Sequence, residues 1–191
     1  MSRKPREWKP NTTYHVYSRG NRRENIFFYK TDREKYLHLL HSVRETHPFN
    51  LHAYCLMSNH IHLLIETKVH PLGSIMRNLH SRYALYLNRR HKLEGHLFQN
   101  RFGATEIINN HQFREVSRYI HLNPVKSGIV HNPSEYVWSS YESYILRTQD
   151  PLLTKTKLQS LFIQPFEKNY QHFVETDRET TKKDLGQAEV K

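Results

Sequence analysis

The chain has 191 residues, of which 37% are hydrophobic, and this size suits one domain or one domain with an appendage. Lys and Arg number 29 against 18 Asp and Glu, which gives a formal net charge of +11. No apolar run approaches the roughly 18 residues of a membrane span, the N-terminus lacks a secretory signal, and the single cysteine, Cys55, excludes an intrachain disulfide. We therefore expect a soluble cytoplasmic protein without a membrane partner.

The first predicted elements are a strand and a helix. Alternation over residues 14–18 predicts the strand. Thr31 and Glu34 have the spacing of a capping box and predict the start of the helix. Apolar residues of this helix recur at helical intervals, at Tyr36, Leu37, Leu40 and Val43. Pro48 and Asn50 are expected to end it.

Two more strands and two more helices follow along the chain. Residues 51–57 and 61–67 are predicted to be strands joined by a tight turn. A second amphipathic helix has its apolar residues at Leu72, Ile75, Leu79, Tyr83 and Tyr86. Another extended stretch is expected within residues 97–108. A third helix is expected over residues 111–123, where Pro124 discourages continuation.

The predicted order is β-α-β-β-α-β, followed by an added helix. That order is typical of the split βαβ, or ferredoxin-like, arrangement, an α+β fold in which an antiparallel sheet carries helices on one face. The other face would then be open for a ligand. We assign the main domain to residues 1–146, a helical extension to 147–174 and a charged, disordered tail to 175–191. Within this scheme, residues 136–146 and 154–166 are expected to add helical turns that pack on the core.

The positive charge is distributed unevenly along the chain. Residues 1–130 hold 21 Lys or Arg against nine acidic residues, whereas residues 131–191 hold eight against nine. A concentrated basic surface attracts polyanions and releases counterions when phosphates bind, so nucleic acid is the leading partner class. The alternative that composition leaves open is a basic protein whose charges are merely solvated.

The sequence His60-Ile-His62 carries the clearest chemical signal. Alternate residues of a strand face the same side, so His60, His62 and Glu66 share one face, and the intervening apolar residues share the other. Two imidazoles on one face make half of a metal site. The alternative is a pair of exposed strand residues, because 15 histidines make one such pair by chance unsurprising. Glu66 could assist from the same strand face, but a solvent-facing acid is the expected role.

The third predicted helix places a second pair of polar residues together. Its buried stripe consists of Phe113, Val116 and Ile120. Tyr119 and Asn123 are four residues apart on one flank of that stripe, so their side chains are neighbours that offer a hydroxyl and an amide oxygen. The alternative is a core aromatic residue and an asparagine that merely ends the helix.

At these residues the chain resembles the single-tyrosine HUH transposases. The resemblance rests on MSNHIHLLIE (residues 57–66) followed by SRYIHLNPVKSGIV (residues 117–130), with YHVYSRGNRRENIF and GHLFQNRF fitting the same pattern. Within that family the chain is most similar to the branch associated with repetitive extragenic palindromes in bacterial genomes. The resemblance covers residues 10–145.

The resemblance implies a transposase that cleaves and rejoins single-stranded or hairpin DNA through a 5′-phosphotyrosine intermediate. By position, Tyr119 matches the nucleophile, and His60 and His62 match the histidines that bind Mg²⁺ or Mn²⁺. Asn123 falls where insertion-sequence transposases carry a glutamine that completes the metal site, and the palindrome-associated branch is similar in having an asparagine there. A nucleoid-associated protein, either a monomer or a homodimer, is implied.

Basic side chains are the predicted contacts to DNA phosphates. The candidates are Arg19, Arg22, Arg23, Arg77, Arg82, Arg89, Arg90 and Arg101. Each arginine alone is readily explained as a solvated charge, and their collective excess is the evidence for DNA binding.

Two other functions remain open. One is a non-catalytic nucleic-acid-binding module on the same fold, against which the intact Tyr119 and histidine pair count. The other is a zinc hydrolase that adds His96 or His121 to the pair, and it leaves both Tyr119 and the basic half of the chain unexplained.

Overall fold

The computed structural model describes residues 9–146 and 148–176. In chain order its elements are β1 (Thr13–Arg19), η1 (Asn21–Arg23), α1 (Lys30–Thr46), β2 (Phe49–Leu56), β3 (His60–Thr67), α2 (Leu72–His91), β4 (Gly103–Glu106), α3 (Asn110–Lys126), η2 (Pro133–Glu135), α4 (Tyr141–Ile145), α5 (Thr156–Ser160) and α6 (Phe166–Glu175). This order confirms the predicted β-α-β-β-α-β succession with an added helix.

The four strands form one antiparallel sheet in the order β2-β3-β1-β4. This is the strand order of the ferredoxin-like arrangement, so the predicted α+β fold class is confirmed. In the central pair, Tyr17 of β1 lies opposite His62 of β3, and Arg19 lies opposite His60. Directly paired residues project from the same side of a sheet, so this register places β1 side chains beside the histidine pair.

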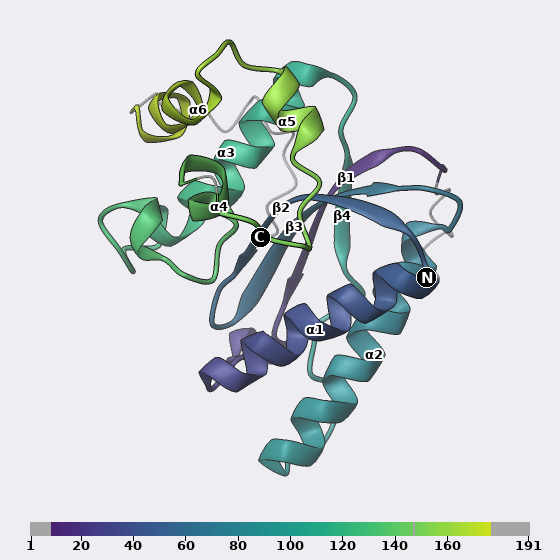
Figure 1. Cartoon of the computed structure of the whole chain (residues 1–191). Helices are drawn as coiled ribbons and strands as arrows, with labels where there is room; N and C mark the ends of the chain where they lie inside the picture. The colour runs from purple at the N-terminus through teal and green to yellow at the C-terminus, as the bar shows by residue number, and fades with distance from the viewer. Residues whose placement is uncertain (1–8, 147, 177–191) are drawn as a thin grey trace.

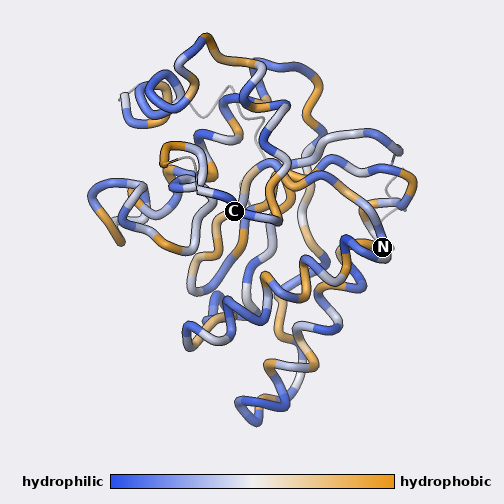
Figure 2. The backbone as a smooth tube through the Cα atoms, in the orientation of Figure 1, coloured by the Kyte–Doolittle hydropathy of each residue, from blue (hydrophilic) through white to orange (hydrophobic). Residues whose placement is uncertain are grey.

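One face of the sheet is covered by α1 and α2 (Figure 1). Ile61, Leu63 and Ile65 point to this layer and are fully buried there, as the alternation in β3 predicts. The two helices meet the strands along their apolar sides, and in Figure 2 the colour changes between hydrophobic and hydrophilic within the turns of each helix. Tyr83 of α2 is buried in this core, where its hydroxyl donates to the carbonyl of Ile26 at 2.6 Å.

A second apolar core lies on the other face of the sheet. Phe113, Val116 and Ile120 of α3 are buried there, which confirms the predicted stripe. They pack with Leu64 of β3 and with apolar residues of α4, α5 and α6, on the opposite side of the sheet from α1 and α2 (Figure 1). The expectation that this whole face is open is therefore wrong. The added helices cover part of it because their own apolar sides need burial.

The far side of α3 is anchored to the C-terminal helices by polar groups. His121 is fully buried, with Nδ1 2.7 Å from the Tyr170 hydroxyl and Nε2 2.8 Å from the Ser140 hydroxyl. The Arg118 guanidinium donates to the carbonyl oxygens of Val174 and Thr176 and lies over the Phe173 ring. These contacts hold α3 between the sheet and α6.

The ends of α1 differ from those predicted. Helix α1 begins at Lys30, and the buried Asp32 carboxylate accepts the backbone N–H groups of Phe28 and Tyr29 at 3.0 and 2.9 Å. The expected capping box of Thr31 and Glu34 is therefore wrong. The Asp32 side chain caps the start of the helix instead, because it accepts the backbone N–H groups of Phe28 and Tyr29. At the other end α1 stops at Thr46, and Asn50 already belongs to β2.

Two boundaries around β4 and α3 also needed tertiary information. The stretch predicted over residues 97–108 is a strand only at Gly103–Glu106, and the preceding loop bonds to the end of β1 through Gln99 N–H and the Arg19 carbonyl at 3.0 Å. Helix α3 runs through Pro124 to Lys126. Pro124 lacks the N–H that would donate to the Ile120 carbonyl, and the helix ends two residues after it.

The helical extension reaches one residue beyond its predicted end at 174. Glu175 closes α6, and its carboxylate accepts the Tyr141 hydroxyl at 2.8 Å, so the disorder predicted from residue 175 is wrong at that position. The rest of the predicted tail, residues 177–191, lies outside the described residues. Over residues 9–146 and 148–176, no helix combines the length and apolarity needed to cross a membrane.

Candidate active site

The histidine pair and the polar flank of α3 come together at the start of β3. Apolar packing of α3 against the sheet turns Asn123 toward the two imidazoles. Its Oδ1 lies 3.0 Å from Nε2 of His60, and its Nδ2 lies 3.3 Å from Nε2 of His62. His62 and Asn123 are buried, and His60 is half-buried. The histidine pair of β3 and Asn123 of α3, which were predicted on separate elements, thus meet at the Asn123 amide group.

The other ring nitrogen of His60 is held by the preceding turn. Nδ1 lies 2.7 Å from Oδ1 of Asn59, and the Asn59 amide is oriented because its Nδ2 donates to the Arg23 carbonyl at 3.2 Å. Burial lowers the pKa of His60. The Asn123 contact acts to raise this pKa, and the nearby Arg19 charge acts to lower it further. Both ring nitrogens of His60 thus face amide oxygens, and a neutral His60 that donates Nδ1–H to Asn59 would present a lone pair at Nε2.

His62 has a third histidine as its neighbour. Nδ1 of His62 lies 3.0 Å from Nε2 of His15 on β1, and the two rings stack at 5.2 Å. Burial lowers the pKa of His62 well below its ordinary value, and repulsion from a charge on His15, His60 or Arg19 acts in the same direction. Burial also lowers the pKa of His15 to about 4. Both imidazoles are therefore neutral near pH 7.

Tyr119 lies beside this cluster. Its half-buried ring meets His62 edge-on at 5.4 Å and His15 at 5.7 Å between ring centroids. The ammonium of Lys126, two turns later on α3, lies 5.4 Å from the centre of the same ring. The structure thus brings Tyr119 together with both histidines and Asn123, and it adds a cation that sequence reasoning did not single out.

The donor set fits a divalent cation. When His60 is protonated at Nδ1, its Nε2 has a lone pair that a cation can accept. This atom lies 3.0 Å from a second potential ligand atom, Oδ1 of Asn123. Two donor atoms at that distance are spaced like adjacent ligands of an octahedral ion with bonds of roughly 2.1 Å. Imidazole and amide oxygen suit Mn²⁺ and accept Mg²⁺. Within the described part of the chain, no three His, Cys, Asp or Glu side chains gather as a metal site, so a metal on the histidine pair would need a ligand of another type, and Asn123 Oδ1 faces Nε2 of His60.

The zinc alternative receives no support from the positions of its extra histidines. His121 faces the C-terminal helices on the far side of α3, and burial lowers its pKa to about 3. His96 is exposed in the segment between α2 and β4. Neither side chain joins the pair on β3.

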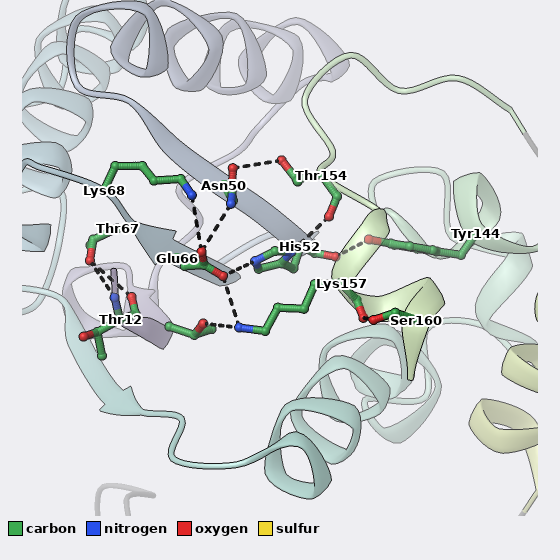
Figure 3. Close-up of polar contacts among 11 residues, drawn as sticks. Thr12, Asn50, His52, Glu66, Thr67, Lys68, Tyr144, Thr154, Lys157 and Ser160 are labelled. Atoms are coloured by element: carbon green, nitrogen blue, oxygen red, sulfur yellow. Dashed lines mark hydrogen bonds and ion pairs between the residues drawn. The ribbon is translucent and has the colours of Figure 1, made fainter. Parts of the chain in front are cut away.

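Glu66 lies at the opposite end of β3 from the site. Its side chain is only 16% exposed, so the prediction of a solvent-facing acid is wrong. Figure 3 shows its carboxylate among Lys157 at 3.1 Å, His52 at 3.2 Å and Asn50 at 3.3 Å. Burial acts to raise the pKa of Glu66, but Lys157 and His52 bring it below the ordinary value. The carboxylate fastens the C-terminal segment to the sheet, and it is roughly 13 Å along the strand from His62.

The structure divides the eight candidate arginines into two groups. Arg19 lies opposite His60, Arg22 and Arg23 follow in η1 beside Asn59, and Arg101 precedes β4; all four are exposed. The other group belongs to α2, on the layer behind the sheet, and consists of Arg77, Arg82, Arg89 and Arg90. In that group Arg82 donates to the Ser42 hydroxyl at 3.2 Å and Arg90 pairs with Asp32 at 3.4 Å.

His15 and Lys126 are the site residues that sequence reasoning missed. The alternation of residues 14–18 already implies that His15 and Tyr17 share a face, but only the register against β3 brings that face to His62. Lys126 follows Tyr119 by seven residues, which is helical spacing for one face. The expected end of the helix before Lys126 hid that signal.

Comparisons with known proteins relate this chain to transposases. Residues 9–123 match the family model described as Transposase IS200 like. A REP-associated tyrosine transposase of Escherichia coli K12 is 23% identical over 146 residues, which are 75% of this chain and 84% of that protein. A solved structure of a REP-associated tyrosine transposase bound to a REP hairpin is similar with a TM-score of 0.66 and 23% identity, covering 81% of this chain and 89% of that one.

Proposed function

Because the chain belongs to the IS200-like transposase family, we propose that it cleaves and rejoins one strand of hairpin DNA with Tyr119 as the nucleophile. The observation that carries this proposal is the convergence of Tyr119, His60, His62 and Asn123 from two elements on one patch. The hairpin substrate is supported by the similar transposase that was solved bound to a REP hairpin.

In each step of the proposed reaction, one phosphate ester bond forms and another breaks. The Tyr119 oxygen attacks the scissile phosphorus and forms a 5′-phosphotyrosine bond while the phenol loses its proton. The bond from phosphorus to the 3′ oxygen breaks, and that oxygen takes up a proton and leaves as a 3′-hydroxyl. The reverse attack by a 3′-hydroxyl reseals a strand and releases the tyrosine, so rejoining needs no nucleoside triphosphate.

The phenol needs help, because its ordinary pKa near ~10 leaves it protonated at neutral pH. The Lys126 ammonium beside the Tyr119 ring favours the phenolate and the phosphate electrostatically. His60, His62 and Asn123 would hold Mg²⁺ or Mn²⁺, which supplies positive charge to the phosphate. The turn contact from Asn59 keeps His60 in the tautomer that ligation requires.

DNA is bound at the end of the sheet that carries the site. Arg19, Arg22, Arg23 and Arg101 are exposed around the start of β3 and are the proposed phosphate contacts. A flexible strand brings its phosphate to a fixed tyrosine more easily than a rigid duplex does, which favours hairpins with single-stranded flanks. Such binding would associate the protein with the nucleoid. Each chain has one Tyr119, so strand exchange takes two chains or two successive steps.

Denaturing gels test the proposal against a non-catalytic binding module. A hairpin with single-stranded flanks is labelled at its 3′ end or its 5′ end and incubated with protein and Mn²⁺ or Mg²⁺. A 5′-phosphotyrosine link shifts only the 3′-labelled strand into a protein-bound band, and the 5′-labelled strand appears as a shorter free fragment. Tyr119→Phe is the matched control, since it should lose the shifted band and keep hairpin binding. A binding module gives no shifted band with either protein.

A further inference from the structure

We propose that His15 is a positioning residue that sets the tautomer of His62. In this arrangement Nδ1–H of His62 donates to Nε2 of His15, so that Nε2 of His62 carries the lone pair that faces Asn123. The inference rests on the proposed function, since it gives His62 the form in which an imidazole binds a metal.

The contact is built by the pairing of the two central strands. His15 of β1 lies opposite Leu64 of β3, diagonally across from His62, and the two imidazole rings are inclined by only 23°. The two nitrogens are 3.0 Å apart, within the range of a direct N–H···N hydrogen bond. The Tyr119 ring borders both imidazoles and limits their movement.

The direction of the hydrogen bond follows from the other side of the His62 ring. The group facing Nε2 of His62 is Nδ2 of Asn123, at 3.3 Å, and an amide nitrogen only donates. Nε2 therefore accepts and carries no proton, so the ring proton of His62 lies on Nδ1. That proton points at His15, whose Nε2 accepts it.

His15 itself is not placed to be a ligand. Its Nε2 is engaged by Nδ1 of His62, on the side of the His62 ring away from Asn123. Asn59 makes the equivalent contact to Nδ1 of His60. Each proposed ligand histidine thus has one nitrogen toward Asn123 and the other against a further side chain, an amide oxygen for His60 and an imidazole for His62.

A matched pair of variants tests this role. His15→Gln keeps an acceptor oxygen near the position of Nε2, whereas His15→Leu keeps the volume and removes the acceptor. In metal-free wild-type protein, long-range ¹H–¹⁵N spectra should show His62 protonated at Nδ1. The Leu variant should lose this single tautomer and the Gln variant should retain it. Mn²⁺ titration followed by EPR should show roughly 10- to 100-fold weaker binding for the Leu variant, with the Gln variant close to wild type.

Two results would overturn the proposal. Wild-type His62 protonated at Nε2 contradicts the assigned direction of the bond, and this measurement needs no variant to fold. A Leu variant with the wild-type tautomer and Mn²⁺ affinity would reduce His15 to a packing residue. If the wild-type tautomer is as proposed but no Mn²⁺ binds, the metal part of the proposed function fails and the role of His15 in fixing the His62 tautomer stands.

Discussion

Two pairs of arginines should contribute very differently to DNA binding, although each pair carries the same charge. Arg22 and Arg23 lie in η1 beside the start of β3, whereas Arg77 and Arg82 lie on α2 behind the sheet. Both arginines of η1 have left-handed backbone, with φ of 52° and 63°. Asparagine tolerates this conformation, so Arg22→Asn/Arg23→Asn removes two charges with little strain. Arg77→Gln/Arg82→Gln removes two charges from a helix and is the control.

The expected size of the effect follows from counterion release. Each phosphate contact contributes a slope of roughly 0.7–0.9 to the fall of log K with log salt concentration, so losing two contacts lowers the slope by about 1.6. At 0.1 M salt this corresponds to roughly 40-fold weaker binding of the hairpin. The α2 variant should change the slope little and the affinity by about twofold, because it alters only the distant field.

Fluorescence anisotropy with a labelled hairpin, measured from about 50 to 300 mM salt, gives both slopes directly. Equal loss of affinity in the two variants would show that DNA responds to net charge alone and not to the placement of η1 near the site. An unchanged slope in the η1 variant would show that Arg22 and Arg23 make no phosphate contact. Circular dichroism at each salt concentration checks that both variants remain folded.

Three further predictions concern the site and the two polar clusters around it. His60→Ala should abolish the covalent DNA adduct at any practical Mn²⁺ concentration, and Asn123→Ala should raise the Mn²⁺ needed for half-maximal adduct by roughly an order of magnitude; full activity of chelator-treated wild type would refute the metal site. Burial lowers the pKa of His121 to about 3, so the neutral ring contributes its full stability above the unfolded pKa of 6.5. This contribution is lost as the pH falls, and the loss amounts to about 2 kcal/mol at pH 5. Urea unfolding at pH 7 and pH 5 should therefore show a smaller pH effect for His121→Gln than for wild type. Lys157→Met should lower the free energy of unfolding by about 1 kcal/mol at pH 7, a value discounted for the exposed part of Lys157. The difference between variant and wild type should vanish below the lowered pKa of Glu66, where this carboxylate is protonated. A difference that does not depend on pH would indicate lost packing only.

The parts of the fold that local periodicity controls were predictable. The buried stripe of α3 follows from helical spacing, and the division of β3 into an apolar face and a histidine face follows from strand alternation. The proximity of Tyr119 and Asn123 also follows from spacing on one helix. These features depend on residues close together in the sequence, so a single chain is enough to show them.

The parts that depend on contacts between distant segments were not predictable. His15 joins the site only through the register of β1 against β3, which no local pattern specifies. Glu66 is buried by Lys157, a residue 91 positions later. For the arginines, periodicity shows which residues are exposed but not which side of the sheet their helix covers. The Asp32 carboxylate, which takes the place of the expected cap, is also contacted at 3.2 Å by His91 from the end of α2.

The anchoring of α3 from behind has a consequence for what part of the chain can be separated from the rest. The match to the family model ends at residue 123, yet the helix that carries Tyr119 is bonded through Arg118 and His121 to segments that come later in the sequence. A fragment cut at the family boundary would retain Tyr119, the histidine pair and Asn123, and it would lose Lys126. It would also leave Phe113 and a guanidinium without the surroundings that bury them. The smallest fragment that keeps α3 packed therefore extends beyond the residues proposed to react, and fusions or truncations should keep the chain through α6.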